Sequence, residues 1–231
     1  MREGILLYGS KARSDHERFS DTDLLGISSD ATISKPFDQF GLSFHVYPKI
    51  WMMQEAQNGS LFLLHIVKEA KAIYDPQNIL LDLRGEFRFK DSYLSDIELG
   101  CRVVSAALGV AEAEFTSRIR RRYFWGLRTA LMAEAAQKRS PRFSAGSLEK
   151  SSGIEGLASH IQGRSDASFS ECREMGERML KHSSQYVGHF SPADRENLEV
   201  LLGRRGVGSV AAGEILYGFG PSLPNAATRP A

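Results

Sequence analysis

The sequence LLYGSKARSDHERFSDTDLLGIS, residues 6–28, consists of two short apolar runs separated by a polar, highly charged segment. The first run ends in Gly9-Ser10, and the second follows directly after Asp21-Thr22-Asp23. Short apolar runs bounded by Gly, Ser and Asp are typical of β-strands. We therefore expect a strand, a turn into a helix, and then a second strand that begins with acidic residues.

The two polar ends of these runs predict a binding site. Gly9 and Ser10 stand at a turn where the backbone N–H groups of a starting helix lack partners, and such a turn can hold a phosphate. Asp21 and Asp23 are two residues apart, so a strand places both carboxylates on one face. Adjacent carboxylates repel each other unless a cation separates them, and Mg²⁺ typically binds one or two carboxylates together with phosphate oxygens. Together these residues predict a site for a nucleoside triphosphate and a divalent metal.

Each pair alone has a simpler explanation. Gly9-Ser10 is then an ordinary turn, and Asp21 and Asp23 are acids at a turn and a strand edge. The joint spacing of the two pairs, together with the apolar runs beside them, favours the binding site.

The segment GSKARSDHERFSDTD, residues 9–23, resembles the Gly-Ser-x10-Asp-x-Asp signature of the DNA polymerase β superfamily. It is most similar to the minimal and aminoglycoside-type (antibiotic-modifying) nucleotidyltransferases of that superfamily. The resemblance implies that Asp21 and Asp23 bind Mg²⁺ or Mn²⁺ and that Gly9 and Ser10 bind the phosphates. Lys11 and Arg13 would lie near the triphosphate, or would be solvated charges of the helix.

The implied reaction transfers a nucleoside monophosphate from an NTP, expected to be ATP, to an acceptor hydroxyl. The resemblance allows three acceptors: a protein side chain, a small antibiotic, or an RNA end. It also implies a nucleotidyltransferase domain followed by a helical bundle.

The strand expected next, LSFHVY at residues 42–47, lacks the third acid that catalytically complete members of the superfamily usually carry there. Alternation places Ser43, His45 and Tyr47 on the face turned toward the aspartates. His45 has three interpretations: general base for the attacking hydroxyl, a noncatalytic group beside the metal, or a structural hydrogen-bonding group. The other acids that folding could bring close, neither convincingly, are Asp38 and Glu69.

The pattern along the chain predicts an α+β protein. A small mixed sheet of three strands is followed by an apolar stripe at residues 63–74 that predicts a helix covering the sheet. After about residue 90 the chain is predicted to be helical, with helices at 94–111, 119–137, 147–161 (N-cap Ser147) and 169–187. The expected divisions are a nucleotidyltransferase domain at 1–90, a helical bundle at 91–203 and a partly disordered tail at 204–231.

One predicted helix is rich in arginine. At 100° per residue, four of its arginines and a tryptophan share one stripe, namely Arg118, Arg121, Arg122, Trp125 and Arg128. Arginines interleaved with an aromatic ring suit nucleic-acid contact, although a charged helix face is also commonly just solvated. Arg120 points into the apolar arc and therefore needs a partner, either the triphosphate or an acid of the bundle.

The composition adds few constraints. There are 29 Lys and Arg against 28 Asp and Glu, so the net charge of +1 indicates neither nucleic acid nor membrane as a general partner. We expect no membrane span, and two distant cysteines without a CxxC motif favour a reducing cytoplasm. Three scattered histidines are expected to be ordinary packing or surface residues: His160, His182 and His189.

Two other functions compete with the enzyme. The missing third acid favours a degenerate, noncatalytic binding subunit that recognises a nucleotide, RNA or a partner protein, in a toxin–antitoxin or antiviral (phage) defence system. A third possibility is an RNA-binding helical module with a vestigial front domain.

Overall fold

The computed structural model describes residues 2–13, 22–29, 37–39 and 41–188. The chain divides into two compact units, Met1–Asp91 and Ser92–Ala231. The expected tail at 204–231 and the aspartate Asp21 both lie outside the described residues.

The first unit is built on a five-stranded mixed sheet in the order β3-β4-β2-β1-β5. β2 and β4 run parallel, whereas the other neighbouring pairs are antiparallel. The strands are β1 Arg2–Tyr8, β2 Thr22–Ser28, β3 Phe37–Gln39, β4 Leu42–Pro48 and β5 Lys71–Tyr74. A mixed sheet followed by helices confirms the predicted α+β class.

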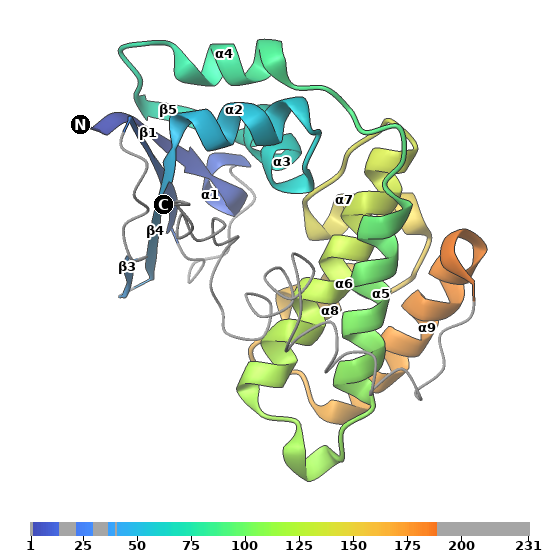
Figure 1. Cartoon of the computed structure of the whole chain (residues 1–231). Coiled ribbons are helices and arrows are strands. Elements are labelled where there is room, and N and C mark those ends of the chain that lie inside the picture. Colours follow the sequence, from blue (N-terminus) through green and yellow to red (C-terminus); the bar gives the residue numbers. More distant parts are fainter. Residues whose placement is uncertain (1, 14–21, 30–36, 40, 189–231) are drawn as a thin grey trace, which may run out of the picture. The chain divides into compact units, whose positions relative to one another are not determined.

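Helices pack on the sheet of this unit around one apolar core (Figure 1). They are α1 Gly9–Arg13, α2 Lys49–Gln57, α3 Leu61–Glu69 and α4 Ile79–Glu86. Leu6 and Leu25, paired on β1 and β2, lie in the core with Leu63 of α3. Because α3 contributes to this core, the predicted covering helix is confirmed over its first part.

The predicted helix at 63–74 is too long. α3 ends at Glu69, Ala70 has an extended backbone, and residues 71–74 form β5 against β1. Ile73 and Tyr74 are 59% and 54% exposed, so they do not belong to the buried stripe. Their spacing matches a helix by coincidence, whereas pairing with β1 satisfies the backbone groups on that side of the strand.

The second unit is helical, with α5 and α6 side by side and α9 packed along α5 (Figure 1). Its elements are α5 Leu94–Leu108, η1 Glu112–Glu114, α6 Ser117–Gln137, α7 Ala145–Ser152, α8 Leu157–Gln162 and α9 Phe169–Val187. The helix predicted at 147–161 is two helices, because the chain turns through left-handed backbone at Gly153 and Gly156. Its N-cap is Ser144, whose hydroxyl accepts from the Ser147 N–H, so the predicted Ser147 cap is wrong.

The contact between α5 and α6 depends on two glycines. A Cβ atom on Gly100 would lie 2.6 Å from the Gly126 carbonyl oxygen and 2.6 Å from the Ala130 nitrogen. A Cβ on Gly126 would lie 2.9 Å from the Gly100 carbonyl oxygen. The two backbones therefore touch at this crossing, and a side chain on either glycine would push the helices apart.

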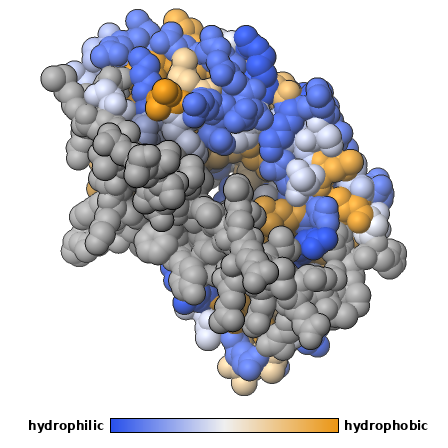
Figure 2. All heavy atoms as spheres, in the orientation of Figure 1, coloured by the Kyte–Doolittle hydropathy of each residue, from blue (hydrophilic) through white to orange (hydrophobic). Residues whose placement is uncertain are grey.

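The surface shown in Figure 2 is mainly hydrophilic where residues are described, with separate hydrophobic side chains among them. Isolated exposed apolar side chains of this kind are ordinary in folded proteins. Among the described helices, none is both long and apolar enough to cross a bilayer.

Replacing Gly100 with Ala is expected to destabilise the protein by about 1–3 kcal/mol, since the new methyl group meets backbone atoms that cannot rotate away. Gly146→Ala is the matched control, because Gly146 is also helical and no atom lies within 4 Å of its Cβ position. That control should be neutral or stabilising by up to ~1 kcal/mol. Urea unfolding followed by circular dichroism measures both. Equal midpoints for the two variants would contradict the close crossing.

Candidate functional site

Gly9 and Asp23 are in direct contact where β1 ends. Tyr8, the last residue of β1, pairs with Asp23 on β2, and Gly9 follows with φ of +75°. A Cβ atom on Gly9 would lie 2.5 Å from Asp23 Oδ2. Glycine is strongly favoured at this position, because other residues rarely adopt the positive φ and a Cβ atom would force the Asp23 carboxylate to move. The turn and the carboxylate therefore form one structural feature.

Two further polar groups lie at the same end of the sheet. Ser10 follows the glycine and is half-buried. The Lys11 ammonium donates to Thr22 Oγ1 at 2.5 Å, which ties α1 to the residue before Asp23. Lys11 is thus anchored beside the turn and is not a freely solvated helix charge.

The parallel pairing of β2 and β4 decides which residue lies beside Asp23. Asp23 pairs with Ser43, and the next pair on the same face is Leu25 with His45. His45 therefore lies two residues, or about 7 Å, further along β4 than Ser43. Its Nε2 is 3.0 Å from Ser43 Oγ, and its ring stacks on Tyr47. Ser43 is therefore the strand partner of Asp23 and also the hydrogen-bond neighbour of His45. Alternation in the sequence does not show which residue of β4 lies opposite Asp23.

Arg13 belongs to a charged cluster below α1. Its Nη1 donates to Glu69 Oε2 at 2.6 Å, and His65 Nε2 is 2.7 Å from the same oxygen. The His65 ring also packs edge-on against Tyr8. Burial, with smaller contributions from Asp23 and Tyr47, raises the pKa of Tyr8 well above its ordinary value. Glu69 therefore lies near α1, and its ion pair with Arg13 joins α3 to α1 within the first unit.

Only one of the two aspartates predicted to bind a metal, Asp23, lies within the described residues. Among the residues that the structure describes, no three His, Cys, Asp or Glu side chains are grouped to hold a metal ion. Asp23 is the described acid of the motif, and Asp21 lies outside the described residues. Ser43 and Glu69 were considered as possible neighbours of the motif, whereas His65 was not, because only the docking of α3 brings it beside Arg13 and Tyr8.

The arginine helix α6 is less uniform than the sequence predicts. Arg118 and Arg121 are exposed, and Trp125 is 38% exposed. Arg122 is buried, with only 9% of its surface accessible. Arg128 is half-buried and donates to the Phe143 carbonyl at 3.3 Å. The predicted solvent-facing stripe of five residues is therefore narrower than the helical angles indicate.

Arg120 lies in the apolar arc, as its angle predicts, and it has an acceptor within the helical unit. Its Nη1 donates to the Ala167 carbonyl oxygen at 3.2 Å. The acceptor is a backbone carbonyl and not the carboxylate that the sequence allowed for. A contact between Arg120 and a nucleotide stays a prediction.

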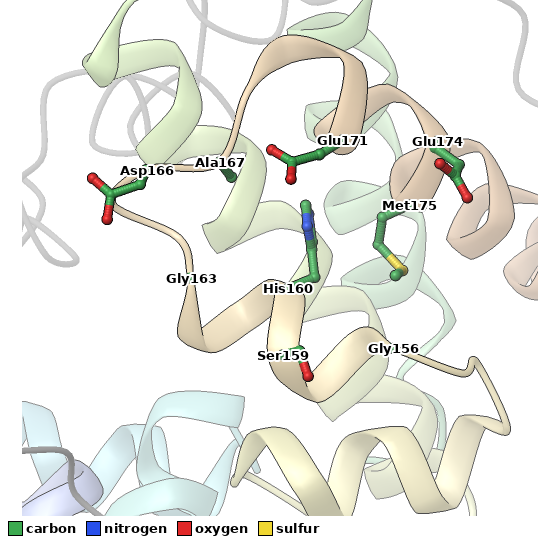
Figure 3. A pocket seen from close by; sticks show the side chains of 9 residues that line it. All are labelled: Gly156, Ser159, His160, Gly163, Asp166, Ala167, Glu171, Glu174 and Met175. Carbon is green, nitrogen blue, oxygen red and sulfur yellow. The ribbon is translucent and has the colours of Figure 1, made fainter.

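The helical unit contains a pocket of about 460 Å³. His160 points toward the side of this pocket that carries Glu171 (Figure 3). Its lining consists of Gly156, Ser159, His160, Gly163, Asp166, Ala167, Glu171, Glu174 and Met175. Behind the pocket, His160 Nε2 is hydrogen-bonded to the Tyr123 hydroxyl at 3.1 Å, and its ring packs on Phe124. His160 is therefore a packing residue that also faces a cavity.

The other polar groups inside the helical unit are held in packed positions. Glu134 is 3% exposed, accepts from Ser183 and lies 2.9 Å from His182 Nε2. Cys101 and Cys172 are buried, and burial raises the pKa of each thiol to about 12. Both cysteines are therefore protonated at neutral pH and are poor nucleophiles. His189 lies outside the described residues.

Comparison with protein-family models gave no match. Comparison with curated proteins also gave none. Among solved structures, the chain is similar to a nucleotidyltransferase-like protein from Exiguobacterium sibiricum 255-15, with 13% identity over 94% of this chain and 80% of the other. The TM-score is 0.29, which leaves the function to be inferred from the site.

The half-buried position of His160 predicts a pH-dependent stability. Burial lowers the pKa of His160, and the nearby Glu171 opposes that shift. The unfolded chain, with a pKa of about 6.5 at this residue, then binds the proton more readily than the folded chain does. This contribution to stability is present above about pH 6.5 and decreases as the pH falls through that value.

Urea unfolding of the wild type and of His160→Gln across this pH range tests the prediction. The wild type should lose more stability on acidification than the variant, and an NMR titration should place the His160 pKa below its ordinary value. A parallel pH dependence in the two proteins would contradict it.

Proposed function

We propose that this protein is a nucleotidyltransferase that moves a nucleoside monophosphate from an NTP, with ATP the expected donor, to an acceptor hydroxyl. The observation that supports it most is the contact between Gly9 and Asp23. A side-chain-free turn at the end of β1 lies directly against a carboxylate on β2. Phosphate and metal chemistry needs this combination of an open backbone turn and a fixed carboxylate.

In this proposal the residues of the first unit have separate roles. Gly9 and Ser10 bind the β- and γ-phosphates, and Lys11, held beside Thr22, supplies positive charge near them. Asp23 and Asp21 hold the metal, since Mg²⁺ accepts one or two carboxylates with phosphate oxygens and water. Bound Mg²⁺ would neutralise phosphate charge and align the attacking and leaving oxygens.

The reaction joins the acceptor oxygen to the α-phosphorus and breaks the bond from that phosphorus to the bridging oxygen, so pyrophosphate leaves. The hydroxyl proton needs an acceptor. His45 is the proposed base, since histidine is the side chain most often used as a general base and this one is hydrogen-bonded to Ser43, the strand neighbour of Asp23.

One observation favours a noncatalytic alternative. The β4 partner of Asp23 is Ser43, so the register supplies no third acid at that point. Arg13, which the resemblance places near the triphosphate, is engaged by Glu69. A subunit that binds a nucleotide without turning it over would need neither a third acid nor a contact from Arg13.

Three substitutions test the enzyme against the binding subunit. Gly9→Ala should reduce label transfer and pyrophosphate release about 100-fold or more, because the added methyl group displaces the Asp23 carboxylate. Asp23→Asn should lose at least as much, since it removes the charge that the metal needs. Asp82→Asn is the matched control, an exposed acid on α4 of the same unit, and should retain the wild-type rate.

The assay uses Mg²⁺ with each α-labelled NTP and, as acceptors, cellular RNA, a protein mixture or an aminoglycoside. Release lost in the two site variants and kept in the control supports the enzyme. Magnesium-dependent NTP binding without release would favour the binding subunit. If no NTP binds or shifts the melting temperature, both functions are wrong.

A further inference from the structure

The helical unit carries a compact positive surface at the start of α6, which we call the arginine patch: Arg118, Arg121, Arg122 and Trp125. These residues have the spacing i, i+3, i+4 and i+7, so they share one face of the helix within two turns. Arg118 and Arg121 are exposed, as is 38% of Trp125. Arg122 lies beneath them, with 9% of its surface accessible.

The positive charges of the patch influence one another. Burial and, after it, the charges of Arg118 and Arg121 lower the pKa of Arg122 to about 10. At neutral pH the group still carries its proton, so all three arginines are charged, and Arg118 and Arg121 are the two that are exposed. The 3-10 turn that precedes α6 carries two acids, Glu112 and Glu114, and Glu114 accepts from the Ala111 N–H at 3.4 Å.

This charge is a local feature. The chain as a whole has a net charge of +1, which gives little attraction for a polyanion. Binding of a polyanion should therefore depend on these few arginines and not on the charge of the whole chain, and it should weaken strongly as salt rises. Arginine suits phosphate in particular, because its planar fork of N–H donors matches two phosphate oxygens.

Trp125 selects among the possible polyanions. Trp125, one helical turn after Arg121 and 38% exposed, offers an aromatic ring on which a base can stack. Bases are available for stacking in single strands, whereas in a duplex they stack on one another. An acidic peptide offers charge for the arginines but no flat ring for the tryptophan.

We propose that the arginine patch binds single-stranded nucleic acid, with phosphates on Arg118 and Arg121 and a base on Trp125. This inference goes beyond the proposed transfer reaction and does not require it, because every residue of the patch lies on α6. If the first unit is also active, a bound RNA would be a candidate for its acceptor.

Fluorescence anisotropy with a short, labelled single-stranded RNA measures the binding. The wild type should bind, and its affinity should fall as salt rises from about 50 to 200 mM. The double variant Arg118→Glu with Arg121→Glu should lose more than ~10-fold in affinity and show a shallower salt dependence. Trp125→Ala leaves the net charge unchanged and should lose roughly 5- to 100-fold through lost stacking.

The matched control is Arg164→Glu with Lys181→Glu, which changes the net charge equally at exposed positions of the same unit. It should bind RNA much better than the patch variant. Circular dichroism and melting curves verify that every variant is folded. Equal losses in the patch and control variants would overturn the proposal, as would unchanged binding in Trp125→Ala.

Two further arms identify the partner and separate this inference from the transfer reaction. Binding to duplex RNA or to polyglutamate as tight as to the single strand would overturn the single-strand assignment. Asp23→Asn should bind RNA like the wild type. Loss of transfer with intact binding then bears on the proposed reaction alone, and loss of binding with intact transfer bears on the patch alone.

Discussion

The first unit depends on the contact between a glycine and a carboxylate. Gly9 has a positive φ, and the space that its side chain would fill is taken by Asp23 Oδ2. The end of β1 therefore lies beside the start of β2, with Tyr8 opposite Asp23. Leu6 and Leu25, the next pair on this face, are buried in the core. An apolar core thus ends at a polar edge, and packing energy holds the edge groups in place.

The charged side chains of the described structure are arranged in two ways, as ion pairs within the packing and as a group of like charges on one helix face. Some have partners that fix them in the structure, as Glu69 has Arg13 and His65, and as Glu134 has Ser183 and His182. Paired in this way, a buried charge is tolerated but contributes little to chemistry. The arginine patch gathers charges of one sign on one face of α6, and such an arrangement favours a polyanion.

Periodicity predicted the long helices well and the short elements poorly. The helix expected at 169–187 is α9 at the same bounds, because five turns of apolar spacing leave no competing pattern. Over residues 63–74 the same spacing continued through a helix and then a strand. The four residues of β5 contain too little pattern of their own, and the unpaired edge of β1 decided their structure. Burial of Arg122 was likewise invisible, since helical angles do not show how closely neighbouring helices approach.

The sequence by itself determined the order of the elements, the α+β class and the residues of the motif, because these follow from local propensity, period and spacing. Only the tertiary structure decided which side chains meet. The register of β2 and β4 placed Ser43 beside Asp23, and the docking of α3 brought Glu69 to Arg13. The physical reason is that contacts between distant segments depend on how whole elements pack, and a residue pattern within one element carries no information about its neighbour.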